Sequence, residues 1–169
     1  GKRCAPVAFE YTERDVILYA LGIGAGVEEE LDFVYEKNLK VYPMFAAIPA
    51  FEAIHVAMAG LAADPARLVH GEHRIVLHSP IPVKGRLLTI AWVEAIYDKG
   101  TGALAVGKAE TANEAGEPMF ENTFSVFIRG EGGYGGDRGP GGRKHIPPDI
   151  EPDFRVEMRT DVDQAALYR

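Results

Sequence analysis

The hydrophobic pattern is densest in residues 50–63, where only Glu52 and His55 are polar. Good helix formers dominate this stretch, so it predicts an α-helix. The two polar residues lie three apart and therefore share one side of that helix. A helix that is apolar nearly all round cannot face water, so the pattern predicts that the rest of the fold encloses it.

The residues before this helix are apolar but irregular. Pro49 lacks an N–H group and restricts Ile48 to extended geometry, although a proline is tolerated at the first helical position. Residues 41–48 are therefore predicted not to be continuous helix. Such a segment either fills the core or lines a pocket, and the residues alone leave both interpretations open.

Four segments between residues 72 and 129 have the apolar and turn pattern of strands in a half-buried sheet. Residues 98–102 predict a tight hairpin turn, and residues 113–117 predict a second turn. A short strand is predicted at residues 6–11, followed by a helix that Thr12 caps. Long consecutive hairpins and one buried helix indicate an α+β hot-dog fold, in which an antiparallel sheet wraps a central helix.

The composition changes after residue 129. Residues 130–142 contain eight glycines, and prolines follow at 147, 148 and 152, which is typical of a linker or a loop held on the surface. Thr160 is predicted to cap a new helix. We therefore divide the chain into a hot-dog domain (1–129), a linker (130–159) and the start of a second domain that is not present (160–169).

Composition and charge narrow the possible functions. The chain has 169 residues, enough for one domain with a core, and a net charge of −7, which disfavours a nucleic-acid groove. The sequence has no apolar run of about eighteen residues and no signal-peptide pattern, so neither a membrane span nor secretion is expected. Cys4 is the single cysteine, which excludes an internal disulfide and fits a reducing compartment.

Two motifs suggest chemistry that their surroundings do not support. Residues 130–135 match G-x-G-x-x-G, but the Gly- and Pro-rich residues that follow cannot open the helix that dinucleotide binding requires. Glu52 and His55 resemble half of a di-iron motif whose other ligands are missing. We expect these two side chains to form a hydrogen-bonded polar pair instead.

Three histidines near the first long strand look like a metal cluster until strand parity is applied. Parity places His73 on the face opposite to His70 and His78, so zinc ligation is not expected. Gly71 either lets a ligand approach the backbone or marks a structural kink. Lys99 at the hairpin tip is either a solvated turn residue or a point charge for a phosphate.

Several stretches spread along the chain together form a specific set: 11–12, 18–22, 33–36, 68–72, 98–100, 122–127, 130–136 and 164–169. With these stretches the chain resembles the (R)-specific 2-enoyl-CoA hydratase type 2 group, the MaoC-like dehydratases. That group includes the hydratase part of peroxisomal multifunctional enzyme type 2. The resemblance covers nearly the whole sequence.

The resemblance implies a double hot-dog, of which this chain is the first repeat. The family's catalytic Asp and His belong to the second repeat, in a run that would follow Arg169. No catalytic residue is therefore carried over, and the chain alone is expected to be inactive. The implied reaction adds water reversibly to a trans-2-enoyl-CoA and gives a (3R)-hydroxyacyl-CoA, a step of fatty-acid β-oxidation.

The resemblance also implies a division of roles among residues of this chain. His70 and Gly71 would contact the acyl-CoA, and Lys99 would help to hold its CoA part. His73 stands where the family more often has Gln, and it could add a pH-dependent charge. The acyl tail would be lined by residues before and within the central helix, namely Met44, Phe45, Ile48 and Phe51. No metal and no cofactor is expected, because CoA is part of the substrate.

The expected partners are the acyl-CoA substrate, a second hot-dog half in the same polypeptide or a partner chain, and a second double hot-dog in a homodimer. Binding to nucleic acid or membrane is not expected, and the location is predicted to be peroxisomal or cytoplasmic. The alternative hypothesis is a non-catalytic hot-dog module that binds a lipid or a protein partner.

Overall fold

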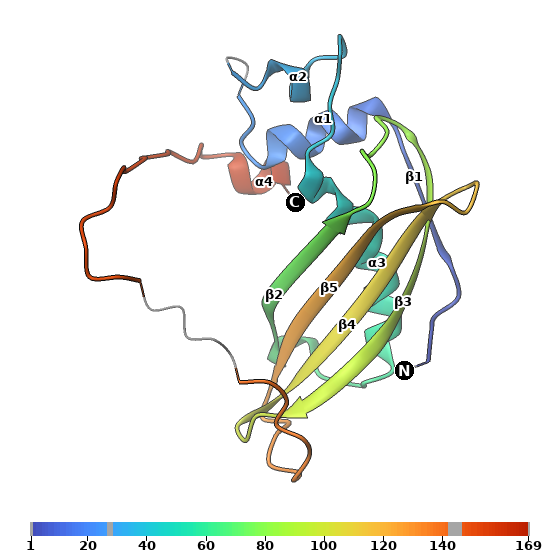
Figure 1. Ribbon diagram of the computed structural model, residues 1–169, viewed down its shortest axis with the longest axis vertical. Helices are drawn as coiled ribbons and strands as arrows, with labels where there is room; N and C mark the ends of the chain where they lie inside the picture. The colour runs from blue at the N-terminus through green and yellow to red at the C-terminus, as the bar shows by residue number, and fades with distance from the viewer. Residues whose placement is uncertain (1, 27–28, 142–146, 169) are drawn as a thin grey trace.

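The computed structural model describes residues 2–26, 29–141 and 147–168. Five antiparallel strands form one sheet in the order β1-β3-β4-β5-β2, and helix α3 crosses one face of it (Figure 1). The elements are β1 Val7–Tyr11, α1 Glu13–Gly22, α2 Leu31–Val34, α3 Ala47–Ala59, β2 Leu68–Leu77, β3 Gly85–Asp98, β4 Gly102–Asn113, β5 Pro118–Arg129 and α4 Gln164–Tyr168. The predicted α+β hot-dog fold is confirmed.

The sheet contains one strand more than the four that were predicted to enclose the helix. Strand β1, expected only as a separate short strand, pairs with β3 along its whole length and forms one edge. Strand β2 forms the other edge and begins at Leu68, before the predicted start at residue 72. Both predicted hairpin turns are present, and Gly100 and Gly116 adopt φ values of 83° and 82°, which glycine tolerates without strain.

The helix is displaced from its predicted bounds. A 3₁₀ turn over Pro43–Ala46 leads directly into α3, so the preceding segment is not continuous α-helix, as predicted, but it is helical rather than extended. Ile48 is itself helical, contrary to the prediction. Pro49 is the third residue of α3, where an N–H group has no partner within the helix, so the proline forfeits no hydrogen bond.

The prediction that α3 is enclosed on all sides is wrong. The helix packs chiefly against β3 and β4, where Ala50 and Ala53 have no exposed surface. On the opposite side, Phe51 and Val56 are 65% and 52% exposed. A single sheet covers only one side of a helix, so the described residues leave an apolar helical face open. Glu52 and His55 are also exposed.

An aromatic cluster fixes the start of α3 to the rest of the domain. The Phe45 ring is 2% exposed and lies 5.2 Å from the Tyr11 ring and 5.5 Å from the Tyr19 ring, centroid to centroid. Phe120 from β5 and Leu87 from β3 complete the same cluster. The 3₁₀ turn is therefore attached to β1, α1 and the sheet together.

Helix α4 packs on the end of α1. The Gln164 side-chain amide donates to the carbonyls of Leu21 (3.0 Å) and Gly22 (2.5 Å), which lack donors within α1. This short helix begins at Gln164, so the predicted cap at Thr160 is wrong. The division of the chain into a domain, a linker and a second domain's start stays a prediction.

The two phenylalanines near the start of α3 should differ sharply in what they contribute to stability. Phe45→Ala removes a buried ring and leaves a cavity, so we expect the free energy of unfolding to fall by about 3–5 kcal/mol. Phe51→Ala removes a mostly exposed ring and should cost less than about 1 kcal/mol. Urea unfolding followed by circular dichroism measures both, and similar losses would contradict the observed burial.

Candidate functional site

A β-bulge at Gly71 sets the geometry of strand β2. His70 pairs with Val126 of β5, whereas Glu72 pairs with Ser125, so the register shifts at the glycine. The shift reverses the alternation of faces, and His70 and His73 therefore lie on the same side of the sheet, the side of α3. The prediction that they face opposite ways is wrong for this reason. Their rings are 5.8 Å apart.

The bulge needs the glycine because the strands approach closely there. A Cβ atom on Gly71 would lie 3.3 Å from the carbonyl oxygen of Ser125, tighter than most real Cβ contacts. The structural kink that was one interpretation of Gly71 is thus present. The contact of His70 and Gly71 with an acyl-CoA stays a prediction.

A chain of hydrogen bonds leads from β2 across β5 to the start of α3. The Asn122 side-chain amide, 1% exposed, donates from Nδ2 to the carbonyl of Ala46 at 3.1 Å. Its Oδ1 lies 2.8 Å from His73 Nε2. Because Oδ1 can only accept, His73 carries a proton on Nε2 and donates it. His73 also packs on the Phe124 ring, with centroids 3.8 Å apart.

The surroundings of His73 favour its neutral form. Burial lowers the pKa of His73 and is the largest influence, the hydrogen bond to Asn122 opposes it, and the nearby His70 lowers the pKa further. His70 itself is exposed, because α3 packs on β3 and β4 and leaves the same side of β2 accessible.

The glycine-rich loop after β5 surrounds a carboxylate of the protein itself. Asp98 accepts 2.8 Å hydrogen bonds from the N–H groups of Gly100 and Gly133 on Oδ1 and of Gly135 on Oδ2. These backbone donors, above all Gly133, lower the pKa of Asp98 to about 2. The G-x-G-x-x-G motif is therefore an anion nest filled by Asp98.

Lys99 lies beside this nest, at the tip of the β3–β4 hairpin. Its Nζ donates to the carbonyls of Arg138 (2.5 Å) and Pro140 (3.2 Å) and lies 5.5 Å from the centre of the Tyr97 ring. The Arg138 guanidinium also reaches the tip, with Nη2 at 4.0 Å from where a Cβ on Gly100 would lie. Two cations therefore lie at this tip.

The four residues predicted to line an acyl pocket do not share one surface. Phe45 is buried, and Ile48 packs against the Phe45 cluster. Met44 and Phe51 are 49% and 65% exposed. Neither of the two cavities described below includes any of the four, and their role in binding an acyl tail stays a prediction.

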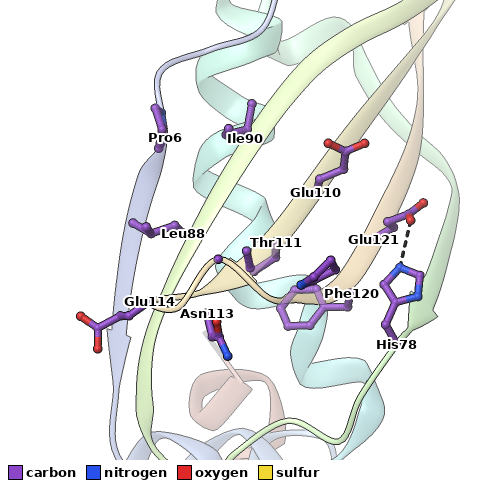
Figure 2. Close-up of a pocket in the computed structure, with 13 residues that line it drawn as sticks. Pro6, His78, Leu88, Ile90, Glu110, Thr111, Asn113, Glu114, Phe120 and Glu121 are labelled. Carbon is purple, nitrogen blue, oxygen red and sulfur yellow. Dashed lines mark hydrogen bonds and ion pairs between the residues drawn. The ribbon is translucent and has the colours of Figure 1, made fainter.

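The larger cavity, about 450 Å³, lies on the face of the sheet opposite α3 (Figure 2). Leu88 and Ile90 contribute its apolar surface, and at its rim His78 Nε2 lies 2.9 Å from a Glu121 carboxylate oxygen. Glu110 is paired with Arg3 at 2.8 Å. Glu110 and Glu121 at the rim are therefore already paired with other side chains of the protein, and the cavity contains none of the predicted site residues.

The smaller cavity, about 280 Å³, lies on the α3 side of the sheet, at the end that carries the β3–β4 hairpin. Its lining includes Ile96, Ala103 and Ile128 from three strands and Tyr134 from the glycine-rich loop. The rest of its lining comes from residues 61–63, which follow α3, and from Glu131, so the cavity lies between the end of α3 and the glycine-rich loop.

The described residues hold neither a metal cluster nor a membrane-spanning helix. Within residues 2–26, 29–141 and 147–168, no three His, Cys, Asp or Glu side chains gather as metal ligands would. Over the same residues, every helix is too short or too polar to cross a bilayer.

The chain is similar to known proteins along nearly its whole length. The profile of the MFE-2 hydratase 2 N-terminal domain matches residues 9–130. The chain belongs to this family. It is 39% identical over 172 residues to a probable enoyl-CoA hydratase 2 of Dictyostelium discoideum, covering 97% of the chain and 58% of that protein. It is 40% identical to 3-hydroxyacyl-thioester dehydratase Y of Mycobacterium tuberculosis, covering 100% of the chain and 60% of that protein.

A solved structure agrees with these relatives. A MaoC-like dehydratase from Phytophthora capsici superposes with a TM-score of 0.80 at 29% identity, over 98% of this chain and 60% of the other. The predicted resemblance is therefore confirmed. The chain spans about three fifths of the length of the curated relatives named above.

Three residues near the candidate site were not predicted from the sequence. Asn122 carried a signal, because it alternates with Phe120 and Phe124 on the buried face of its strand. Asp98 was recognised only as part of a turn. Arg138 lies in a segment whose composition predicts no fixed conformation.

The lowered pKa of His73 makes a prediction about stability and pH. The unfolded chain binds a proton near the ordinary histidine pKa of about 6.5, whereas folded His73 binds it only at lower pH. The stability that His73 contributes is therefore complete above about pH 6.5 and is lost as the pH falls through the folded pKa.

Urea unfolding of the wild type and of His73→Gln between about pH 5 and pH 7.5 measures this dependence. Glutamine can donate to Asn122 but does not titrate, so the variant should lose less stability at the acid end. Identical slopes in the wild type and His73→Gln would contradict the prediction.

Proposed function

We propose that this chain is the acyl-CoA-binding half of an (R)-specific trans-2-enoyl-CoA hydratase. The observation that carries the proposal is the accessible α3 side of β2 at His70, beside the Gly71 bulge, in a family whose relatives are enoyl-CoA hydratases. A bulged backbone leaves polar groups unpaired within the ladder, and these can contact a ligand.

The sheet geometry supports a path for an extended ligand. His70 is level with Val126, Ala105 and Ile96 across successive strands, and Lys99 lies three residues beyond Ile96. Strand spacing and rise place His70 and Lys99 roughly 17 Å apart. The cavity lined by Ile96, Ala103 and Ile128 lies between them. The pantetheine arm of CoA would cross it, with the thioester near His70 and phosphate near Lys99 and Arg138.

The chemistry needs more than this path supplies. Hydration of a 2-enoyl thioester requires a general acid and base for water and a donor for the developing charge on the thioester oxygen. We assign these groups to a second hot-dog half. We further propose that β2 and the exposed face of α3 contact this second half. We also propose that two double hot-dogs pair as a homodimer, located in a peroxisome or the cytoplasm.

Hydration of crotonyl-CoA and decenoyl-CoA tests the proposed division of labour. We expect no hydration by this chain alone and measurable hydration by a polypeptide extended past Arg169. Calorimetry should detect acyl-CoA binding to both. Absence of activity in the extended form together with absence of binding in either would favour the alternative, a hot-dog module for a lipid or a protein partner.

The charge of Lys99 should matter for CoA and little for stability. Lys99→Ala removes one charge-assisted contact to phosphate, so affinity for CoA esters should fall about tenfold. The melting temperature should hardly change, because the Lys99 contacts are exposed.

The matched control for this variant is Lys108→Ala. Lys108 pairs with Glu94 at 2.7 Å, away from the proposed path. Its loss should leave CoA-ester affinity unchanged. Calorimetry of all three proteins with butanoyl-CoA measures the effect, and equal affinity of the wild type and Lys99→Ala would remove Lys99 from the site.

A further inference from the structure

We propose that His73 and Asn122 are positioning residues that determine which acyl chain lengths the domain accepts. This inference rests on the proposed function and names a specificity device within the same site. Its basis is the hydrogen-bonded link from His73 through Asn122 to the Ala46 carbonyl, which joins β2 to the start of α3.

The link crosses the path that an acyl tail would take. Three pairs of residues follow one another on the α3 side of the sheet, each farther from the β3–β4 hairpin than the one before. They are His70 with Val126, His73 with Phe124, and Ile75 with Asn122. From the level of Val126 to that of Asn122 the strand advances about 13 Å. A tail that starts at His70 and runs along β2 and β5 would therefore meet the link at a medium chain length.

The link also fixes the walls on both sides of this path. Ala46 ends the 3₁₀ turn that carries the buried Phe45, so the Asn122 amide holds that turn against β5. The His73 ring lies 3.8 Å from the Phe124 ring and 5.8 Å from the His70 ring, and His70 lies 5.9 Å from Phe124, so the three rings form one cluster in which the orientation of His73 limits that of His70. Because both ends of the Asn122 amide are hydrogen-bonded, β2, β5 and the start of α3 are held in one arrangement. An apolar residue in its place would let the start of α3 and β2 separate.

The test compares the binding of CoA, butanoyl-CoA, decanoyl-CoA and tetradecanoyl-CoA by calorimetry, with wild type, His73→Gln, His73→Leu and Asn122→Leu. Glutamine preserves the donor to Asn122, so His73→Gln should keep the wild-type ratio of affinities. His73→Leu and Asn122→Leu should raise the affinity for tetradecanoyl-CoA relative to butanoyl-CoA by at least about threefold, with CoA alone unchanged.

A matched control separates positioning from a general loss of stability. Thr89 and Thr111 form a buried 2.8 Å hydrogen bond on the α3 side of β3 and β4, and Thr111→Val removes it. This variant should lower the melting temperature without changing the affinity ratios. If Asn122→Leu does not fold, His73→Leu decides, because it breaks the link at its β2 end and keeps the bond from Asn122 to Ala46 that supports the fold.

The outcomes distinguish this inference from the proposed function. An unchanged chain-length ratio in His73→Leu, in a wild type that binds acyl-CoA, overturns the inference alone. A shift that His73→Gln shows equally also overturns it, because the link is then not the cause. A wild type that binds no acyl-CoA of any length removes the proposed function and the inference together.

Discussion

The close approach of α3 to β3 and β4 determines how the rest of the domain is arranged. Ala50 and Ala53 on the helix face Ala91 and Ala109 on the strands, and these four residues form one of the buried core clusters with Ile54 and Phe124. A Cβ on Gly107 would lie 2.8 Å from the end of the Met58 side chain. Small facing residues let a helix and a sheet pack at high density. The helix therefore lies toward β3 and β4, and His70 on β2 stays accessible.

The other half of the sheet has larger and more polar residues facing the helix, so its connection to α3 is of another kind. Phe124 fills space, while Asn122 makes a directional contact with Ala46. A buried amide is costly unless both its ends are paired, and here His73 and Ala46 pair them. Apolar packing tolerates sliding, whereas these bonds do not. The space beside β2 is therefore set by hydrogen-bond geometry as well as by packing.

The periodic parts of the fold could be predicted from the sequence, because strands, turns and caps depend on neighbours in the chain. The exposed face of α3 could not be predicted from the sequence, because an apolar pattern shows that a face needs covering but not what covers it. The prediction that His70 and His73 lie on opposite faces was wrong because it assumed regular strand pairing, and the bulge at Gly71 interrupts that pairing. The bond from Asn122 to Ala46 joins residues 76 apart, a pairing that no local pattern reveals.

The two ends of the proposed acyl-CoA path differ in how they respond to pH. At the hairpin end, Asp98 holds the glycine-rich loop whose carbonyls contact Lys99, and the backbone donors keep its pKa at about 2. Asp98 therefore remains charged at physiological pH and continues to hold this loop beside Lys99. At the β2 end, burial lowers the pKa of His73, so mild acid adds a charge that its surroundings resist. Sensitivity to mild acid should therefore arise at the His73 end of the proposed path rather than at Asp98.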